Sequence, residues 1–253
     1  MPHLSVTTLP DMPLVKAGDD LAALVLAALA REELALSDGD IIVLAQKIVS
    51  KAEGRLVSLA SVTPGPEARD LAARTDKDPR LVQLIIDESS EVLRAKPGVI
   101  IVRHRLGHVG ANAGIDQSNI EHIDGETALL LPRDPDASAV RLRDALVAAS
   151  GRRVGVIIAD SLNRPWRLGT LGGAIGCAGL QVLDDRRGGE DMFGRELKVT
   201  LINRADAIAA MATLAMGETT EGTPAALVRG FEPDAVDGRA AEIMRPREDD
   251  LFR

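Results

Sequence analysis

The sequence predicts a mixed α/β fold of the α+β kind, with mixed sheets and flanking helices. Short aliphatic runs at 41–45 (IIVLA) and 154–158 (VGVII) have the length and composition of buried strands. Longer apolar segments at 21–34 and 204–216 have the length of helices. The chain has 253 residues, 45% of them apolar, which is enough to enclose one large core or two small lobes.

Composition argues against several functional classes. The net charge of −8 argues against general nucleic-acid binding, and 2% aromatic residues leave few side chains for base stacking. No apolar run approaches the roughly 20 residues of a membrane span, and the N-terminus lacks the pattern of a signal peptide. Cys177 is the only cysteine, which fits a reducing compartment. We therefore expect a cytoplasmic protein without nucleic-acid or membrane partners.

Cap and turn signals divide the first half of the chain. Asp20 precedes the segment 21–34 and is a suitable N-cap, because its carboxylate can accept a hydrogen bond from the first helical turn. Lys47 and Lys51 follow the strand at 41–45 and would share one face of a helix, as phosphate contacts or as a solvated basic turn. Further elements are expected in this order: a strand at 54–59, helices at 67–75 and 79–94, and a hairpin at 97–114.

Two groups of titratable residues in this half are interpreted as structural. Asp87, Glu88 and Glu91 lie opposite the apolar face of the second expected helix, which indicates a solvated surface. His104 and His108 are four residues apart, but side chains with this spacing need not converge in a hairpin. We therefore expect neither group to bind a metal.

The second half follows the same alternation of strands and helices. Asp134 precedes a proline at the start of an expected helix, and Gly151 is suited to end it. The expected elements are a strand at 129–132, a helix at 134–149, a strand at 196–203, a strand at 224–229 and an amphipathic helix at 238–252. No repeat, low-complexity tract or linker is present, so residues 1–253 are expected to form a single module whose lobe boundary is not readable.

The stretch 154–179 carries the main functional signal. Its strand ends at Asp160 and Ser161, where a carboxylate and a hydroxyl offer the oxygen ligands that a hard divalent cation prefers. Arg164 and Arg167 follow, and then a glycine-rich run that permits close backbone approach. Together these groups indicate a site for a nucleotide phosphate. The alternative is a strand, a salt-bridged turn and a glycine-rich packing segment.

Two other stretches offer oxygen ligands. Asp116 and Asn119 lie in a stretch of small residues, NAGIDQSN, which suits either a binding loop or an Asx-type turn. Glu218 and Glu221 lie in the loop after the helix at 204–216; they could coordinate a metal or be solvated residues after a helix end. The sequence contains neither a P-loop motif nor a GxGxxG motif placed after a strand.

With these stretches in place, the chain resembles the coenzyme F420-0:L-glutamate ligase (F420:gamma-glutamyl ligase) family. Asn163 stands where the family has glycine, and asparagine tolerates a left-handed conformation better than most residues. The matching segments keep their order over almost the whole chain: MPLVKAGDDL (12–21), AQKIVSKAEGR (45–55), NAGIDQSN (112–119), GVIIADSLNRPWRLG (155–169), AIGCAG (174–179), FGRELKVT (193–200) and AMGETTEGTPAALVRG (215–230).

The resemblance implies an F420-ligase-type fold with two intimately connected lobes. It also implies an intertwined homodimer, with nucleotide and metal bound in a groove and no familiar nucleotide fingerprint. Because the sequence ends near residue 253, we expect no C-terminal nitroreductase-like domain of the kind fused to some bacterial members.

The resemblance also implies the roles of individual residues. The metal ligands would be Asp116, Asp160 and Ser161, with Glu218 a further candidate, and the metal would be Mg²⁺ or Mn²⁺, with K⁺ a further possibility. Arg164 and Arg167 would hold either a phosphate or the phosphodiester of the deazaflavin, and with Lys51 and Asp160 they form the expected catalytic set. The expected GTP contacts are Met12, Pro13, Leu14, Val15, Gln46, Lys47, Lys51 and Asn119.

The implied reaction adds L-glutamate to the deazaflavin coenzyme F420-0 through a γ-glutamyl amide. GTP would activate the carboxylate, through an acyl phosphate that the amine of glutamate attacks. Two alternatives remain open. A metal-dependent phosphohydrolase acting on a nucleotide or phosphate ester would release product without an amine acceptor, and a non-catalytic nucleotide-binding or scaffold protein would bind nucleotide without turnover.

Overall fold

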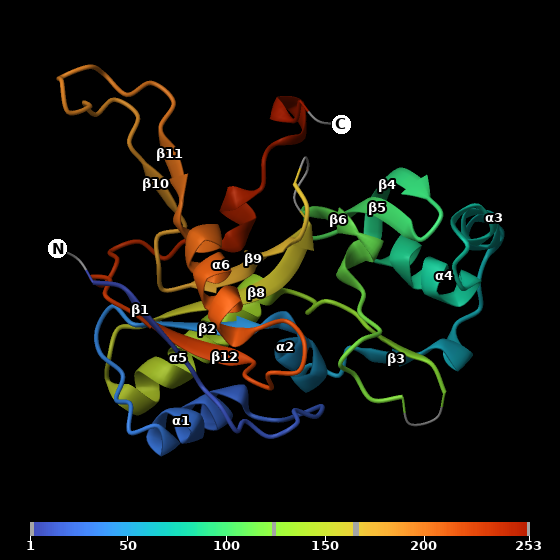
Figure 1. Ribbon diagram of the computed structural model, residues 1–253, viewed down its shortest axis with the longest axis horizontal. Coiled ribbons are helices and arrows are strands. Elements are labelled where there is room, and N and C mark those ends of the chain that lie inside the picture. The colour runs from blue at the N-terminus through green and yellow to red at the C-terminus, as the bar shows by residue number, and fades with distance from the viewer. Residues whose placement is uncertain (1–2, 123–124, 164–166, 252–253) are drawn as a thin grey trace.

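A five-stranded mixed sheet forms the centre of the molecule (Figure 1). The computed structural model describes residues 3–122, 125–163 and 167–251. In the sheet only β2 and β8 run parallel, and the other neighbours are antiparallel. The strands in spatial order are β1 (Ser5–Thr8), β12 (Ala225–Arg229), β2 (Ile41–Ala45), β8 (Gly155–Asn163) and β9 (Thr170–Ala178).

Helices cover both faces of this sheet, which explains why β2 and β8 are apolar throughout. Ile42 and Leu44 of β2 face a core shared with α1 (Leu21–Arg31) and α5 (Pro135–Ser150). Ile41 and Val43 face the opposite core, beneath α6 (Arg204–Met216). Successive strand residues point to opposite faces, so a continuous apolar run fills two cores. The strand expected at 41–45 and the helix expected at 204–216 are confirmed.

The helix signals read from the sequence are confirmed at the atomic level. Asp20 Oδ1 accepts a hydrogen bond from the Ala23 N–H at 3.1 Å, and Asp134 Oδ1 accepts one from the Ala137 N–H at 2.9 Å. Gly151 ends α5 with a φ of +67°, a conformation that glycine adopts at little cost. Each cap satisfies backbone groups that the helix itself leaves unpaired.

The glycine-rich run forms the buried strand β9. A Cβ at Gly172 would lie 2.3 Å from Thr213 Oγ1 of α6, and one at Gly176 would lie 2.3 Å from the carbonyl oxygen of Pro135 in α5. Both helices therefore approach β9 more closely than any side chain would allow. In this run the packing interpretation holds, and these two glycines do not present free backbone to a ligand.

Between α2 (Gln46–Ala52) and α5 the chain makes one continuous excursion, which we call the small lobe (right in Figure 1). Its own core contains Leu59, Ile85 and Ile100. The small lobe consists of β3 (Leu56–Ser58) paired with β7 (Thr127–Leu129), α3 (Pro66–Thr75), α4 (Pro79–Asp87), and the sheet β4 (Ser89–Lys96), β5 (Val99–His104) and β6 (Val109–Ala111).

Two expectations for the small lobe are wrong, and the strand expected at 129–132 forms earlier in the chain, as β7 (Thr127–Leu129). The helix expected at 79–94 ends at Asp87, and residues 89–96 form β4, because the apolar strand β5 offers them a pairing partner. Glu88 is buried instead of solvated, where it meets Arg55, His104 and Arg105. The hairpin expected at 97–114 is confirmed as β5 and β6. Within it His104 and His108 stack with ring centroids 4.9 Å apart.

Two C-terminal expectations also differ from the structure. Of the strand expected at 196–203, only β11 (Leu201–Asn203) forms, and its pairing with β10 (Leu183–Asp185) makes an arm that projects from the body (Figure 1). The tail at 238–252 forms two short 3₁₀ turns instead of a helix, η3 (Ala240–Ile243) and η4 (Arg247–Asp249). The Asp136 carboxylate accepts the N–H groups of Ala240 and Ala241, which fixes the tail in this irregular path. No helix in the described residues is long and apolar enough to cross a membrane.

Candidate functional site

The candidate site lies at the carboxyl edge of the two parallel strands. Ala45, the last residue of β2, pairs with Ala159 of β8, so Gln46 and Asp160 both follow at the same edge of the sheet. The carboxyl ends of parallel strands are where ligands bind in open α/β sheets. The sheet therefore places the first turn of α2 beside the strand that carries the expected metal ligand.

Asp116 reaches this edge from the small lobe and makes two polar contacts with α2. Gln46 Nε2 donates to Asp116 Oδ2 at 2.8 Å, and Lys47 Nζ lies 2.7 Å from the same oxygen. The backbone of Asp116 is fixed by two hydrogen bonds with Leu129, of 3.0 and 2.8 Å. Asp116 is thus held by both lobes, and the structure brings the AQKIVSK and NAGIDQSN stretches into contact.

The 112–119 stretch owes its path to unusual backbone conformations. Asn112, Ala113 and Asn119 all have φ between 53° and 57°, a region that non-glycine residues adopt at some cost. Gly114 also has a positive φ, and a Cβ there would lie 2.9 Å from the Leu131 side chain. The left-handed residues turn the chain twice within a short distance and direct Asp116 towards α2.

Lys51 joins three segments at the same edge. Its Nζ donates to the Asn119 carbonyl at 2.9 Å, and Asn119 Nδ2 donates to the Thr219 carbonyl at 3.1 Å. Burial lowers the pKa of the Lys51 ammonium, Glu121 opposes this shift, and the charge of Lys47 adds to it. Lys51 and Asn119, both expected site residues, are therefore in contact.

Asp160 has a strongly perturbed carboxyl group. Burial, together with the charges of Asp116 and Glu218, raises the pKa of Asp160 to about 7, against the opposing effects of the Ser161 N–H and Lys47. The Ser161 N–H donates to Asp160 Oδ1 at 2.8 Å. Carboxylates close enough to perturb each other's ionisation in this way are typical of functional sites.

Glu218 lies on the loop that follows α6. Its Oε2 accepts a hydrogen bond from Thr170 Oγ1 at 2.7 Å, which ties this loop to the start of β9. The same loop carries Thr219, whose carbonyl accepts the Asn119 amide. Glu218 also lies close enough to Asp160 for its charge to raise the pKa of that carboxyl group.

The donor chemistry of the site fits a divalent cation. The charges of Asp116 and Glu218 both repel that of Asp160, a positive ion would relieve this repulsion, and carboxylate oxygens are hard ligands. In the parts of the chain that the structure describes, no three His, Cys, Asp or Glu side chains converge into a metal-binding group. One or two carboxylates are sufficient for Mg²⁺ when water and phosphate oxygens complete its coordination. The metal remains a prediction.

Other expected site residues lie apart from this cluster. Val15 is buried and Met12 packs against the main core, whereas Leu14 is 75% exposed. The segment that follows them approaches the end of α2, where the Gly18 N–H bonds to the Ala52 carbonyl at 2.9 Å. Contacts between residues 12–15 and GTP thus remain a prediction.

Among the described residues, no hydrogen bond or ion pair brings Arg167, one of the two arginines expected to act in catalysis, to the cluster. Arg167 is exposed and makes no ion pair with another described residue. Arg164 lies outside the described residues. The roles of both arginines also remain predictions.

Four residues at the site were missed in the sequence: Ser50, Glu121, Thr170 and Thr219. Only Ser50 left a readable signal, because it is four residues after Gln46 and would share a helical face with it. Glu121 and Thr219 reach the site on loops and Thr170 at the start of β9, and no local pattern encodes their approach.

A cavity of about 350 Å³ lies at the opposite edge of the sheet, beside Ile41 and Gly155 at the starts of β2 and β8. Among its described lining residues, no buried side-chain nitrogen or oxygen lacks a hydrogen-bond partner. The carboxyl edge, with its interacting charges, is therefore the stronger candidate site.

The F420-0:Gamma-glutamyl ligase family model matches residues 11–230. The chain belongs to this family. The coenzyme F420:L-glutamate ligase of Methanothermobacter thermautotrophicus is 48% identical over 252 residues, 99% of each chain. The ligases of the same name from Methanopyrus kandleri and Methanocaldococcus jannaschii are 44% and 41% identical, covering 100% and 96% of this chain and 99% and 94% of their own.

The resemblance read from the motifs is thereby confirmed. In this F420-0:gamma-glutamyl ligase family member, the groups that meet at the carboxyl edge come from the segments 45–55, 112–119, 155–169 and 215–230. Four of the seven segments that carried the resemblance are thus brought together by the fold.

Proposed function

We propose that this protein ligates L-glutamate to coenzyme F420-0 through a γ-glutamyl amide, with GTP as the co-substrate. Family membership and the names of the relatives support the ligation. The observation that carries the proposal is the meeting of Asp116 and Asp160 with Lys47 and Lys51 at one edge of the sheet. Carboxylates beside lysines can bind a metal–phosphate complex within an acidic protein.

The proposed reaction proceeds in two steps that balance. A carboxylate oxygen of coenzyme F420-0 attacks the γ-phosphorus of GTP, which yields an acyl phosphate and GDP. The amine of L-glutamate then attacks the acyl carbon, loses a proton and expels inorganic phosphate as the amide forms. Phosphoryl transfer requires chiefly alignment and neutralisation of negative charge. Lys47 and Lys51 supply positive charge at the site.

A divalent cation, Mg²⁺ or Mn²⁺, would be held by Asp116 and Asp160, with Ser161 and Glu218 as further ligands and K⁺ as an additional candidate ion. When bound, it would neutralise phosphate charge and orient the phosphate oxygens. Lys51 would remain fixed on the Asn119 carbonyl until a phosphate offers it a stronger partner. The two lysines and the cation would thus together neutralise the negative charge of the phosphates.

A phosphohydrolase using the same carboxylates is the alternative, and one assay separates the two functions. Purified protein is incubated with GTP, Mn²⁺, L-glutamate and coenzyme F420-0, and GDP release and the mass of the deazaflavin are followed. We expect a mass gain of one or more glutamyl units, and GDP formation that depends on both co-substrates. Rapid GTP hydrolysis without either co-substrate, and no mass gain, would support the phosphohydrolase.

Replacing Lys51 with alanine is expected to raise the KM for GTP about tenfold or more, because a hydrogen bond to a charged group contributes about 1.5–3 kcal/mol. The KM for L-glutamate should change by less than about threefold. Steady-state kinetics with each substrate varied in turn will test this, with Lys96→Ala, an exposed lysine of β4, as the control. A defect confined to the glutamate KM would contradict the assignment.

We also propose that the protein is a homodimer. The segment between β10 and β11 exposes Met192, Phe193 and Val199, with 93%, 91% and 86% of their surfaces accessible. Apolar side chains on a projecting arm suit burial against another chain. Light scattering at micromolar concentration should give twice the chain mass of 26.8 kDa. A fully active monomer would exclude the dimer.

A further inference from the structure

The helix α2 contains a buried polar pair that the proposed mechanism does not use. Ser50 is 0% exposed and Gln46 is 2% exposed, and Ser50 Oγ donates to Gln46 Oε1 at 2.9 Å. Serine inside a helix usually bonds to the backbone carbonyl four residues earlier. Here the hydroxyl bonds to the side chain of that residue instead, so it acts on the orientation of an amide.

The orientation of the Gln46 amide decides what it presents to Asp116. With Oε1 engaged by Ser50, Nε2 points at Asp116 Oδ2 and donates to it at 2.8 Å. The reversed amide would place an oxygen against the carboxylate and leave the Ser50 hydroxyl without its acceptor. Losing either contact inside the protein would leave a polar group unpaired, which costs about 1–3 kcal/mol.

The contact with Gln46 leaves the two carboxylate oxygens of Asp116 with different hydrogen bonding. Oδ2 receives both Gln46 Nε2 and Lys47 Nζ, whereas Oδ1 accepts no hydrogen bond from a described residue. Of the two donors Lys47 is the more accessible, because 28% of its side chain is exposed and Gln46 is 2% exposed. Gln46 is enclosed, so it holds Asp116 even when Lys47 moves to a phosphate.

We propose that Ser50 and Gln46 are positioning residues that fix the Asp116 carboxylate for cation binding, with Oδ2 held by the protein and Oδ1 free for the ion. The inference rests on the proposed function, since it assumes the metal role of Asp116. It assigns Gln46 a task other than the GTP contact expected from the resemblance, because a side chain with 2% exposure and both ends engaged has little surface for a nucleotide.

The test measures Mn²⁺ binding directly, by electron paramagnetic resonance of the free ion in the presence of GDP. Gln46→Met keeps the side-chain volume but removes both hydrogen bonds, and should weaken Mn²⁺ binding about 10- to 100-fold, as does loss of other groups that orient metal ligands. Ser50 contacts Gln46 and not Asp116 itself, so Ser50→Ala should weaken Mn²⁺ binding less, about three- to tenfold. The KM for GTP at saturating Mn²⁺ should stay within about twofold in both variants.

Thr75→Val is the matched control, because it removes a fully buried helical hydroxyl that bonds to Leu71 in α3, in the small lobe core. It should lower the melting temperature and leave Mn²⁺ affinity unchanged. If Ser50→Ala behaves in the same way, Ser50 is purely structural and the proposal is overturned. If Gln46→Met raises the GTP KM with unchanged Mn²⁺ affinity, Gln46 is a nucleotide contact. A wild-type protein that binds no Mn²⁺ would overturn the metal site itself along with this inference.

Discussion

Asp160→Asn is expected to lower turnover by at least about 100-fold in a protein that remains folded. The substitution keeps the shape of the side chain but removes its charge. That charge interacts with the charges of Asp116, Glu218 and Lys47. Cation affinity depends on the number of charged ligands, so a neutral amide should weaken the proposed metal–phosphate complex. Substitutions that act only indirectly, through groups that orient metal ligands, lower metal affinity or activity about 10- to 100-fold. Loss of a ligand charge should therefore lower activity further.

The measurement is kcat over a titration of Mg²⁺ and Mn²⁺, with circular dichroism to establish folding. Asp70→Asn is the control, because Asp70 is an exposed residue of α3 that pairs only with Arg74 among the described ion pairs. It should retain wild-type activity. Near-normal turnover of folded Asp160→Asn at saturating metal would remove Asp160 from the proposed site.

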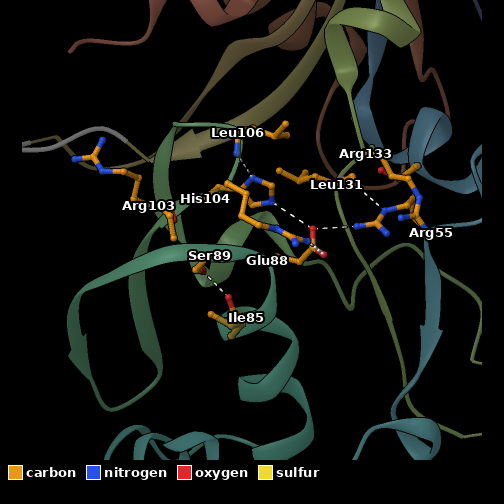
Figure 2. Close-up of polar contacts among 12 residues, drawn as sticks. Arg55, Ile85, Glu88, Ser89, Arg103, His104, Leu106, Leu131 and Arg133 are labelled. Carbon is orange, nitrogen blue, oxygen red and sulfur yellow. Dashed lines mark hydrogen bonds and ion pairs between the residues drawn. The ribbon is translucent and has the colours of Figure 1, made fainter. Parts of the chain in front are cut away.

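Glu88→Gln is expected to lower the free energy of unfolding by about 3–5 kcal/mol, the usual cost of removing one partner from a buried ion pair. Figure 2 shows the Glu88 carboxylate between Arg55 and His104. Its oxygens lie 3.0 Å from Arg55 Nη2 and 2.6 Å from Arg105 Nη2, with His104 Nε2 at 3.6 Å. The loss would leave the Arg55 guanidinium buried without its counter-charge.

Acid should destabilise the protein through the same region. Burial alone would raise the pKa of Glu88, but His104, Arg55 and Arg105 lower it to about 2. Because this is below the unfolded value of 4.5, the stabilisation is present above pH 4.5 and is lost as the pH falls towards 2. Burial and the neighbouring His104 lower the pKa of His108 to about 4, so its protonation favours unfolding as the pH falls from 6.5 to 4.

Thermal unfolding between pH 3.5 and 7.5 tests both effects. The wild-type melting temperature should fall from about pH 6.5 downwards, and below about pH 4.5 Glu88→Gln should lose stability less steeply than the wild type. The control, Glu67→Gln, replaces an exposed residue in the first turn of α3 and should stay within about 0.5 kcal/mol of wild type. A Glu88→Gln variant as stable as this control would show that the cluster adds nothing to stability.

The sequence was sufficient where short-range patterns decide structure. The apolar run at 41–45, the Asp20 and Asp134 caps and the helix at 204–216 depend on neighbours within a few residues, and all were predicted. Glu88 was interpreted wrongly because its partner Arg55 is 33 residues away. A local pattern shows that acidic side chains lie opposite an apolar face. It does not show whether they contact solvent or an arginine distant in the chain.

The same distinction separates the predicted and missed parts of the site. The ordered motifs identified Asp116, Asp160, Lys47 and Lys51, but not how they meet, because Gln46 and Asp116 are 70 residues apart in the chain. The tail was expected to be helical from its amphipathic pattern. Hydrogen bonds from Ala240 and Ala241 to Asp136, more than 100 residues earlier, determine its path instead.

The strand order of the central sheet has a consequence for synthesis on the ribosome. β12 lies between β1 and β2, so the first strand of the chain has no partner in the sheet until residues 225–229 have been made. The small lobe encloses a core of its own, built from residues 59–130, and can begin to form much earlier. A nascent chain therefore carries an unpaired β1 for most of its translation, and folding ends with the insertion of a late strand between two early ones.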